Sequence, residues 1–322
     1  MPTLNTGRII LAPMEGVVDA SVRHLITQFG GVDQCVTEFI RITDQVLPRH
    51  VFTRFAPELL TSARTSHGVP VAVQLLGSNP ETLAGNAAKA AALGSPSVDL
   101  NFGCPSKTVN KHRGGAVLLD EPQVIHDIIS AVRAAVPKAT PVTAKMRLGN
   151  KDKSLALENA LAIQEAGASE VVIHARTKVE GYKPPAHWEW IARLKEHLTI
   201  SVVANGEIWT PDDYQRCREI SGCADVMIGR GLIARPELAM MIKAINNGNQ
   251  SESAQWQSII NMLLQYFTMV ESQMMPRYVH GRIKQWLKMM RSQREEADGL
   301  FEEIKQIKDL NELRRHLESK QE

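Results

Sequence analysis

The most regular feature of the chain is a set of eight short β-branched segments between residues 8 and 228, with successive starts roughly 24 to 44 residues apart. The segments are Arg8–Ala12, Cys35–Phe39, Pro70–Leu75, Ser97–Asn101, Pro141–Met146, Glu170–His174, Ile200–Ala204 and Asp225–Ile228. Such spacing matches a strand followed by a crossover helix and a variable loop. The pattern therefore predicts eight βα units.

The stretches between these segments follow the sequence rules of helices. Pro80 and Glu81 open an alanine-rich stretch that ends at Gly94, and Pro211 opens another; proline suits the first helical position. Eight βα units over about 235 residues predict a (β/α)₈ barrel, an α/β fold. A doubly wound sheet is the alternative, but the glycine-rich GxGxxG turn expected after its first strand is absent.

Beyond about Arg235 the strand pattern stops, and from Ala254 to the end the sequence reads as amphipathic helices. The stretch Asn246-Asn247-Gly248-Asn249 is the clearest linker. We therefore predict a catalytic barrel over residues 1–245, followed by a small helical-bundle domain over residues 246–322.

Composition agrees with a large globular protein. Hydrophobic residues make up 43% of the chain, and no apolar run reaches the length of a membrane span, so we expect a cytoplasmic protein. The four cysteines have no disulfide-framework or metal-site spacing, which favours reduced thiols and no metal. The net charge of +2 excludes little, because the charge is unevenly distributed. We expect a monomer.

Polar residues and glycines follow seven of the eight predicted strands. These strand ends are Ala12–Gly16, Gln74, Asn101–Pro105, Lys145–Arg147, His174–Arg176, Asn205–Glu207 and Gly229–Gly231. Chemistry in barrel enzymes is located at the carboxyl ends of the strands. The pattern therefore predicts one active site built from most of the strands.

The last two strand ends have the features of a phosphate site. Gly206, Gly229 and Gly231 let a ligand approach backbone N–H groups, and Arg230 adds a charge-assisted contact. The alternative is that these glycines only make tight turns.

A phosphate there, with Met14, Gln74 and Lys145 across the barrel mouth, predicts a cradle for flavin mononucleotide (FMN). Gln74 offers a donor and an acceptor to the ring edge, and Lys145 stabilises negative charge on the reduced ring. The alternative for Lys145 is an ion pair with Glu15 or Glu38, because an unpaired buried lysine is costly. For His174 the alternative is a hydrogen-bonded core residue.

Cys104 lies between Gly103 and Pro105, before a loop with the basic residues Lys107, Lys111, His112 and Arg113. A free thiol has a pKa of about 8.5, so it is mostly protonated near neutral pH. That favours proton donation to carbon; a nucleophile would need a dedicated base, and no histidine partner is assignable. The alternative is an inert buried thiol, our interpretation of Cys35, Cys217 and Cys223.

A second basic region runs from Arg277 to Arg294 without an acidic residue. At helical spacing it has an apolar face of Ile283, Trp286, Leu287 and Met290, and a basic stripe of Arg277, Lys284, Lys288 and Arg291. One-sided positive charge is typical of a surface that binds a nucleic-acid backbone. A solvated helix face is the alternative.

With these residues in view, the chain resembles the tRNA-dihydrouridine synthases along almost its whole length. The resemblance rests on Ala12-Pro13-Met14-Glu15-Gly16, Val73-Gln74-Leu75, Asp99-Leu100-Asn101-Phe102-Gly103-Cys104-Pro105-Ser106-Lys107, Gly114-Gly115-Ala116, Lys145-Met146-Arg147-Leu148-Gly149, His174-Ala175-Arg176-Thr177, Asn205-Gly206-Glu207-Ile208 and Met227-Ile228-Gly229-Arg230-Gly231. The stretches Thr37–Arg41 and Arg282–Leu287 resemble the C type, which modifies position 16 of the tRNA D-loop.

The resemblance implies two sets of contacts. The flavin contacts would be Pro13, Met14, Glu15, Gln74, Lys145, His174, Asn205, Gly206, Glu207, Gly229 and Arg230. The contacts that orient tRNA would be Arg41, Asn101, Tyr182, Arg282, Lys284 and Lys305. Met289 stands where a tyrosine is expected.

The resemblance also implies the reaction. NADPH or NADH reduces bound FMN, a hydride passes to C6 of a uracil, and Cys104 protonates C5, giving 5,6-dihydrouridine. The target base leaves its stack while the helical domain holds the tRNA. A flavin barrel acting on a free pyrimidine, similar to dihydroorotate dehydrogenases, is one alternative, but the basic helix argues against it. Another alternative is an RNA-binding protein whose barrel has lost its catalytic activity. The presence of Cys104, Lys145 and the glycine loops argues against it.

Overall fold

Parallel strands form one sheet that closes on itself in the computed structural model, which describes residues 7–250 and 253–321. The strands are β1 (Ile9–Leu11), β2 (Gln34–Val36), β3 (Ile40–Arg41), β4 (Val71–Leu76), β5 (Val98–Phe102), β6 (Val142–Arg147), β7 (Glu170–His174), β8 (Ser201–Asn205) and β9 (Val226–Ile228). Closure comes from β1, which pairs with both β2 and β9, while β2 also pairs with β4. The (β/α)₈ barrel is confirmed, and the open doubly wound sheet is excluded.

The second barrel strand differs from the prediction because it is interrupted. Over residues 37–39 the chain leaves the ladder, and the Thr37 hydroxyl accepts the backbone N–H of Gln74 at 3.0 Å. The chain then returns to β4 as the two-residue strand β3. Side-chain bonding therefore replaces part of the ladder, which an apolar pattern cannot reveal.

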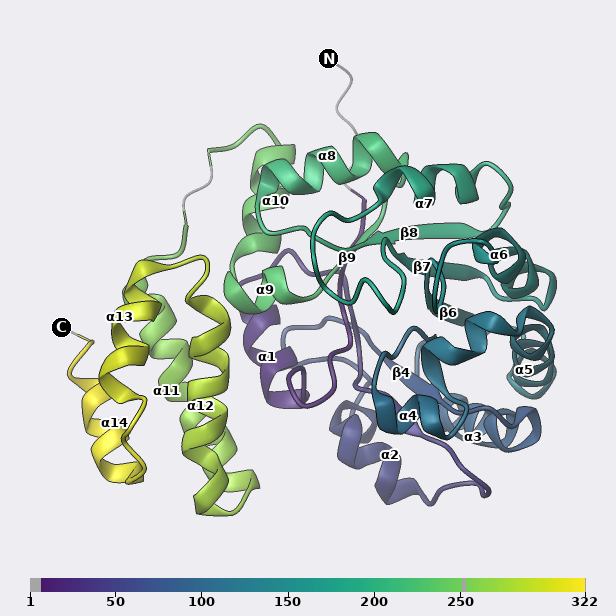
Figure 1. The fold of residues 1–322 in the computed structure, drawn as a ribbon. Helices are drawn as coiled ribbons and strands as arrows, with labels where there is room; N and C mark the ends of the chain where they lie inside the picture. Colours follow the sequence, from purple (N-terminus) through teal and green to yellow (C-terminus); the bar gives the residue numbers. More distant parts are fainter. Residues whose placement is uncertain (1–6, 251–252, 322) are drawn as a thin grey trace.

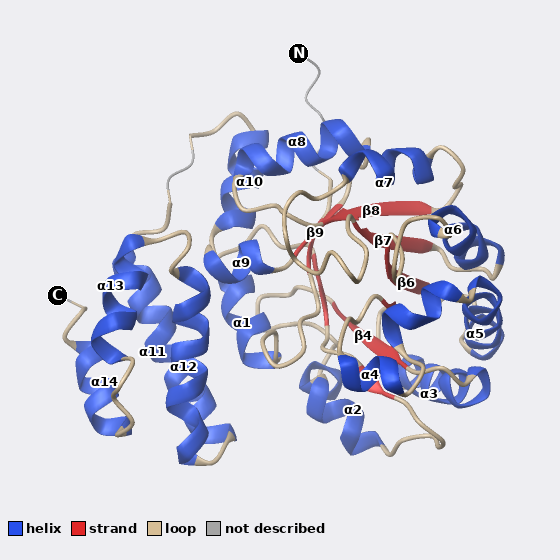
Figure 2. Cartoon of the chain, viewed as in Figure 1, coloured by secondary structure: helices blue, strands red, loops and turns tan. Residues whose placement is uncertain are grey.

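Helices surround the strands (Figures 1 and 2). They are α1 (Ala20–Gln28), α2 (Arg49–Phe55), α3 (Pro80–Ala92), α4 (Lys107–Lys111), α5 (Pro122–Ala135), α6 (Ala156–Glu165), α7 (Trp188–Lys195), α8 (Pro211–Ser221), α9 (Arg230–Ala234) and α10 (Leu238–Asn246), with the 3₁₀ turns η1 (Pro57–Leu60) and η2 (Gly115–Asp120). Both predicted helix starts are confirmed: Asn79 caps α3, and Thr210 with Asp213 forms a capping box on α8.

Successive side chains along each strand point to opposite faces of the sheet, so the strands contribute to two apolar layers. One cluster of buried side chains comprises Ile10, Ala12, Val36, Ala72, Val172, Val203 and Met227. Their neighbours Ile9 and Leu11 belong instead to the larger cluster that the strands share with the helices. The barrel is therefore a packed core, and a ligand has room only at its mouth.

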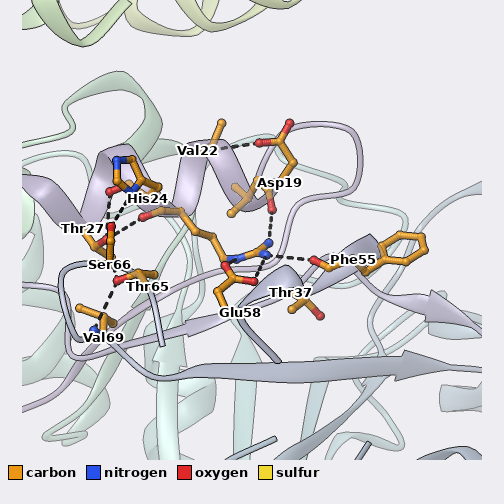
Figure 3. Close-up of polar contacts among 12 residues, drawn as sticks. Asp19, Val22, His24, Thr27, Thr37, Phe55, Glu58, Thr65, Ser66 and Val69 are labelled. Atoms are coloured by element: carbon orange, nitrogen blue, oxygen red, sulfur yellow. Dashed lines mark hydrogen bonds and ion pairs between the residues drawn. The ribbon is translucent and has the colours of Figure 1, made fainter. Parts of the chain in front are cut away.

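Two charged contacts fix the first βα unit. Arg8 pairs with Glu170 and Asp225, which lie at the amino ends of β7 and β9. Arg23 of α1 is fully buried, and its guanidinium donates to the Glu58 carboxylate and to the Phe55 carbonyl, both at 2.9 Å. Figure 3 shows the Glu58 carboxylate and the Phe55 carbonyl joined by dashed lines to the same side chain, while the Phe55 ring points away. The unit that carries the first strand-end loop is thereby held in place.

Four further helices pack on one side of the barrel, beside α1 and α9 (Figure 1). They are α11 (Trp256–Gln273), α12 (Pro276–Met290), α13 (Glu295–Ile304) and α14 (Leu310–Glu318). The predicted apolar face of α12 is confirmed: Ile283, Trp286, Leu287 and Met290 are buried. The Trp286 indole donates to the Ile233 carbonyl at 2.9 Å, and Arg294 pairs with the fully buried Glu237 at 2.5 Å.

The division of the chain after residue 245 stays a prediction.

No helix within the described residues is both long and apolar enough to cross a bilayer.

A pair of adjacent glycines tests how the loop after α1 is packed. Gly30 and Gly31 both have φ of +83°, but a Cβ on Gly30 would meet open space, whereas on Gly31 it would lie 2.4 Å from the Ala239 carbonyl carbon of α10. Gly30→Ala should destabilise by the conformational strain alone, about 1–2 kcal/mol. Gly31→Ala should cost roughly 1–3 kcal/mol more, because backbone must move. Urea unfolding of both variants checks this, and equal losses would contradict the packing.

Candidate active site

A cavity of about 400 Å³ opens at the carboxyl ends of the strands. Its walls come from the loops after β1, β5, β6, β7, β8 and β9, and from α12 through Met289. Thirteen of the predicted site residues line it: Pro13, Met14, Glu15, Asn101, Cys104, Lys145, His174, Tyr182, Asn205, Gly206, Glu207, Gly229 and Arg230. The fold thus brings together residues that lie more than two hundred positions apart in the sequence.

Cys104 presents a protonated thiol to this cavity. Its side chain is mostly buried, and burial raises the pKa of the thiol, an effect that the Ser106 N–H opposes. The backbone is fixed on both sides: the Cys104 N–H donates to Asn101 Oδ1 at 2.9 Å, and its carbonyl accepts from Asn110 Nδ2 at 3.0 Å. The site therefore holds a weak acid in a fixed position.

Lys145 lies in the same cavity as an amine without a carboxylate partner among the described residues. Its Nζ donates to the neutral Asn205 Oδ1 at 2.9 Å, so the alternative ion pair with Glu15 or Glu38 is wrong. Glu38 instead accepts the backbone N–H of Gly16. Burial, followed by the charge of Arg147, lowers the pKa of Lys145 to about 7. An anionic ligand would restore its proton.

Arg147 and His174 are two further basic side chains on the cavity wall. Arg147 joins the loops after β5 and β7 by donating to the carbonyls of Gly103, Thr177 and Gly181 at 2.9–3.0 Å. His174 is buried, with 6% of the residue exposed, and it lines the cavity. Burial, then the charge of Arg147, lowers the pKa of His174 well below its usual value. At neutral pH this imidazole is uncharged.

The glycines after β8 and β9 are required by the fold as well as by any ligand. Gly206 has φ of +123°, and a Cβ on it would lie 3.0 Å from the His174 ring. A Cβ on Gly231 would lie 2.1 Å from the Ile208 carbonyl oxygen, so the two loops are in direct backbone contact. Close backbone packing therefore explains Gly231, a positive φ explains Gly206, and Gly206, Gly229 and Gly231 all line the cavity.

Arg230 is held in place at the cavity edge by aromatic rings. Its guanidinium carbon lies 5.0 Å from the ring centre of Tyr182 and 4.9 Å from that of Trp209. Glu207, which has the unusual φ of +58°, pairs with Arg176 and accepts from the Trp209 indole at 2.8 Å. Burial opposes ionisation of Glu207, but the hydrogen bonds from Arg176 and Trp209 and the charges of Arg176 and Arg230 together lower its pKa. A fixed cation thus faces the cavity.

Five predicted site residues lie elsewhere. Gln74 is completely buried and does not line the cavity; its amide bonds Asp99 and Asn101. Arg41 is half-buried on β3. Arg282 pairs with Asp19 and donates to the Gly16 carbonyl.

The other two belong to the C-terminal helices. Lys284 donates to the carbonyls of Lys305 and Ile307 at 2.9 and 2.5 Å, and Lys305 pairs with Glu302. The basic stripe on α12 is also less uniform in space than along the chain, because α13 supplies Asp298 and Glu302 to Arg291. Arg277 and Lys288 are exposed.

Sequence reasoning assigned no role to several residues that line the cavity: Val17, Phe39, Ser106, Arg147, Ile208, Trp209 and Met289. Arg147 is among the polar strand ends that predict the active site, but the sequence assigns no ligand contact to it. Met289 reaches the cavity from a helix at the far end of the chain, so only tertiary packing places it there.

Comparison with known proteins identifies the family. The family model described as "Dihydrouridine synthase (Dus)" matches residues 10–322. This chain belongs to the dihydrouridine synthase family. It is therefore an oxidoreductase that forms dihydrouridine, as the resemblance in its motifs implied.

Relatives match the enzyme over nearly its full length. A tRNA-dihydrouridine(16) synthase of Aquipseudomonas alcaligenes is 53% identical over 306 residues, covering 95% of this chain and 97% of that protein. Proteins of the same name from Pseudomonas putida and Shewanella oneidensis are 52% and 50% identical, covering 96% and 98% of this chain and the same shares of their own lengths.

Solved structures share the fold at low sequence identity. 2-Naphthoyl-CoA reductase aligns with a TM-score of 0.57 at 13% identity, covering 82% of this chain and 53% of its own. The old yellow enzyme homologue from Zymomonas mobilis aligns with a TM-score of 0.53 at 11% identity. The alignment covers 78% of this chain and 91% of that chain. At these identities the likeness concerns the barrel alone.

The lowered pKa of Lys145 predicts a pH dependence of stability. Between about pH 7 and its usual value of 10.5, the unfolded chain binds a proton that the folded chain does not. The free energy of unfolding should therefore rise with pH in this window, by at most about 1.4 kcal/mol per pH unit. Lys145→Met should remove that rise.

Urea unfolding between pH 7 and 10, on protein stripped of small molecules, measures the difference between wild type and Lys145→Met. The exposed Lys138 supplies a control, and Lys138→Met should leave the rise intact. A constant difference between wild type and Lys145→Met across this range would rule out the perturbed amine.

Proposed function

We propose that the enzyme reduces the C5–C6 double bond of a D-loop uridine in tRNA, at position 16, with FMN as cofactor and NADPH as reductant. The observation that carries the proposal is that Cys104, Lys145 and the glycine loops after β8 and β9 face one cavity. The names of the relatives at about half identity support the substrate and its position. A tRNA substrate also supports the cytoplasm as the site of action.

The cavity fits FMN in size and in donor chemistry. Its volume lies in the range of small-molecule sites, and its walls combine apolar side chains with a few polar groups. We assign the phosphate to the backbone of Gly206 and Gly229 with Arg230, and the ring to Met14 and Lys145. When bound and reduced, FMN supplies the hydride that adds to C6 of the uracil.

Cys104 supplies the proton. The uracil C5–H bond forms as the Sγ–H bond breaks, so the double bond gains one hydride and one proton and the thiol becomes a thiolate. Burial keeps the thiol protonated until that step, and nearby Arg147 stabilises the thiolate afterwards. Solvent then returns the proton. The neutral His174 adds no competing charge at the same wall.

The basic surface binds the tRNA backbone. Exposed basic side chains lie on α4 and its following loop, namely Lys107, Lys111, His112 and Arg113, and on α12, namely Arg277 and Lys288. The target base leaves its stack to reach the cavity, where Tyr182 is 53% exposed at the entrance. Arg282, Lys284 and Lys305 support the surface through contacts within the protein.

The proton-donor role is tested by Cys104→Ala. The variant should keep the yellow flavin, because the thiol is one wall group among many, yet lose dihydrouridine formation on tRNA by about 10²–10⁴-fold. Mass spectrometry of digested tRNA measures the product. Cys223→Ala is the matched control, since that thiol is also buried but does not line the cavity. A fully active Cys104→Ala enzyme would refute the assignment.

The RNA surface is tested by charge reversal at exposed positions. Lys288→Glu combined with Arg277→Glu should weaken tRNA binding and reduce the slope of affinity against salt by about one per lost phosphate contact. Lys138→Glu makes the same kind of change on the loop before β6, near the opposite end of the barrel, and should have no effect. Filter binding at several salt concentrations measures both. Unchanged affinity in the α12 variant would contradict this surface.

A further inference from the structure

Strand β5 carries a buried carboxylate that the reaction does not use. Asp99 is 2% exposed, and burial raises its pKa to about 6. It accepts from two neutral donors, Thr143 Oγ1 and Gln74 Nε2, each at 2.6 Å. Burying a carboxylate opposes folding, and apolar groups of similar volume often serve a core as well or better. A role beyond packing would explain its presence.

Strand register places Asp99 at the start of a line of contacts. Asp99 lies opposite Gln74 on β4 and opposite Thr143 on β6. Asn101 follows two residues later on β5, on the same face of the strand. Its Nδ2 donates to Gln74 Oε1 at 2.8 Å, and its Oδ1 accepts the N–H groups of Gly103 and Cys104, each at 2.9 Å.

The direction of these hydrogen bonds is fixed at both ends. Backbone N–H groups can only donate, so the Asn101 oxygen must face Cys104 and its nitrogen must face Gln74. An ionised carboxylate can only accept, so the Gln74 nitrogen must face Asp99. If the acceptor at Asp99 were lost, the Gln74 amide would be free to turn over, and its nitrogen would then oppose the Asn101 nitrogen.

We propose that Asp99 is a positioning residue for Cys104, acting through the side chains of Gln74 and Asn101. The inference rests on the proposed function, because it concerns the placing of the proton donor. Asp99 touches no reacting group: it fixes which way two amides point, and they fix the backbone from which the thiol is presented.

Two substitutions of Asp99 separate this role from a role of its charge. Asp99→Asn keeps an acceptor for Gln74, because the Thr143 hydroxyl can turn to accept from the new amide nitrogen. Asp99→Leu removes the acceptor. If Asp99 acted instead through its charge on Lys145, both variants would be equally impaired.

The first readout is the rate at which iodoacetamide alkylates Cys104 in the flavin-bound enzyme without tRNA, followed by peptide mass spectrometry. Asp99→Leu should alkylate several-fold faster, because the loop loses its anchor, while Asp99→Asn should stay within about threefold of wild type. Thr143→Val removes the other hydrogen bond to the same carboxylate and should leave the rate unchanged.

The second readout is steady-state kinetics on tRNA. Asp99→Leu should lower kcat by about 10- to 100-fold through misplacement of the donor, with little change in KM for tRNA. Asp99→Asn should restore kcat. If Asp99→Leu does not fold, Gln74→Met breaks the same line of contacts at its middle, and its alkylation rate takes the place of the first readout.

Unchanged alkylation in Asp99→Leu, or in Gln74→Met where it substitutes, overturns the inference, as does an Asp99→Asn enzyme as impaired as Asp99→Leu. A wild-type enzyme that forms no dihydrouridine would refute the proposed function, while the alkylation comparison would still decide the role of Asp99.

Discussion

Closure of the barrel is the constraint on which the rest of the structure depends. The three-residue strand β1 pairs on one side with β2 and on the other with β9, so a few backbone hydrogen bonds join the two ends of the sheet. Closure turns a row of strand ends into a ring. The loops that begin at residues 12 and 229 then lie side by side on the wall of one cavity, whereas an open sheet would leave them at opposite edges.

The interior of that ring changes character along its axis. Around Ile10 and Met227 it is apolar and packed. Toward the mouth it contains Lys145 and Asn205, and Asp99 lies deeper, near the amino end of β5. The burial of these polar groups is costly and is offset by hydrogen bonds. The pKa values of Asp99 and Lys145 are both perturbed, as expected where charged groups are held for binding or chemistry.

Much of this could be predicted from the sequence, because the signals are local. The β-branched period revealed the barrel, and polar residues where each strand ends revealed Cys104, Lys145 and Asn205. Contacts across the fold could not be predicted. The burial of Gln74 depends on the neighbouring strand β5, the ion pairs of Arg291 depend on α13, and the contact of Arg282 with the first loop depends on how α12 packs. At the break in the second strand, the Thr37 hydroxyl accepts the backbone N–H of Gln74 from the neighbouring strand.

The helices after residue 255 extend the active site as well as supporting it. Met289 lines the cavity, and Arg282 and Gln285 of the same helix bind the carbonyl of Gly16 in the loop after β1. A tRNA bound on α12 would therefore contact an element that also shapes the cavity.

The most direct test of the whole account is a map of dihydrouridine in tRNA from a strain that lacks this enzyme, with and without the gene restored. The account predicts that D-loop position 16 alone returns to uridine and that the wild-type gene restores its reduction. Dihydrouridine that persists at position 16, or is lost at another position instead, would contradict it.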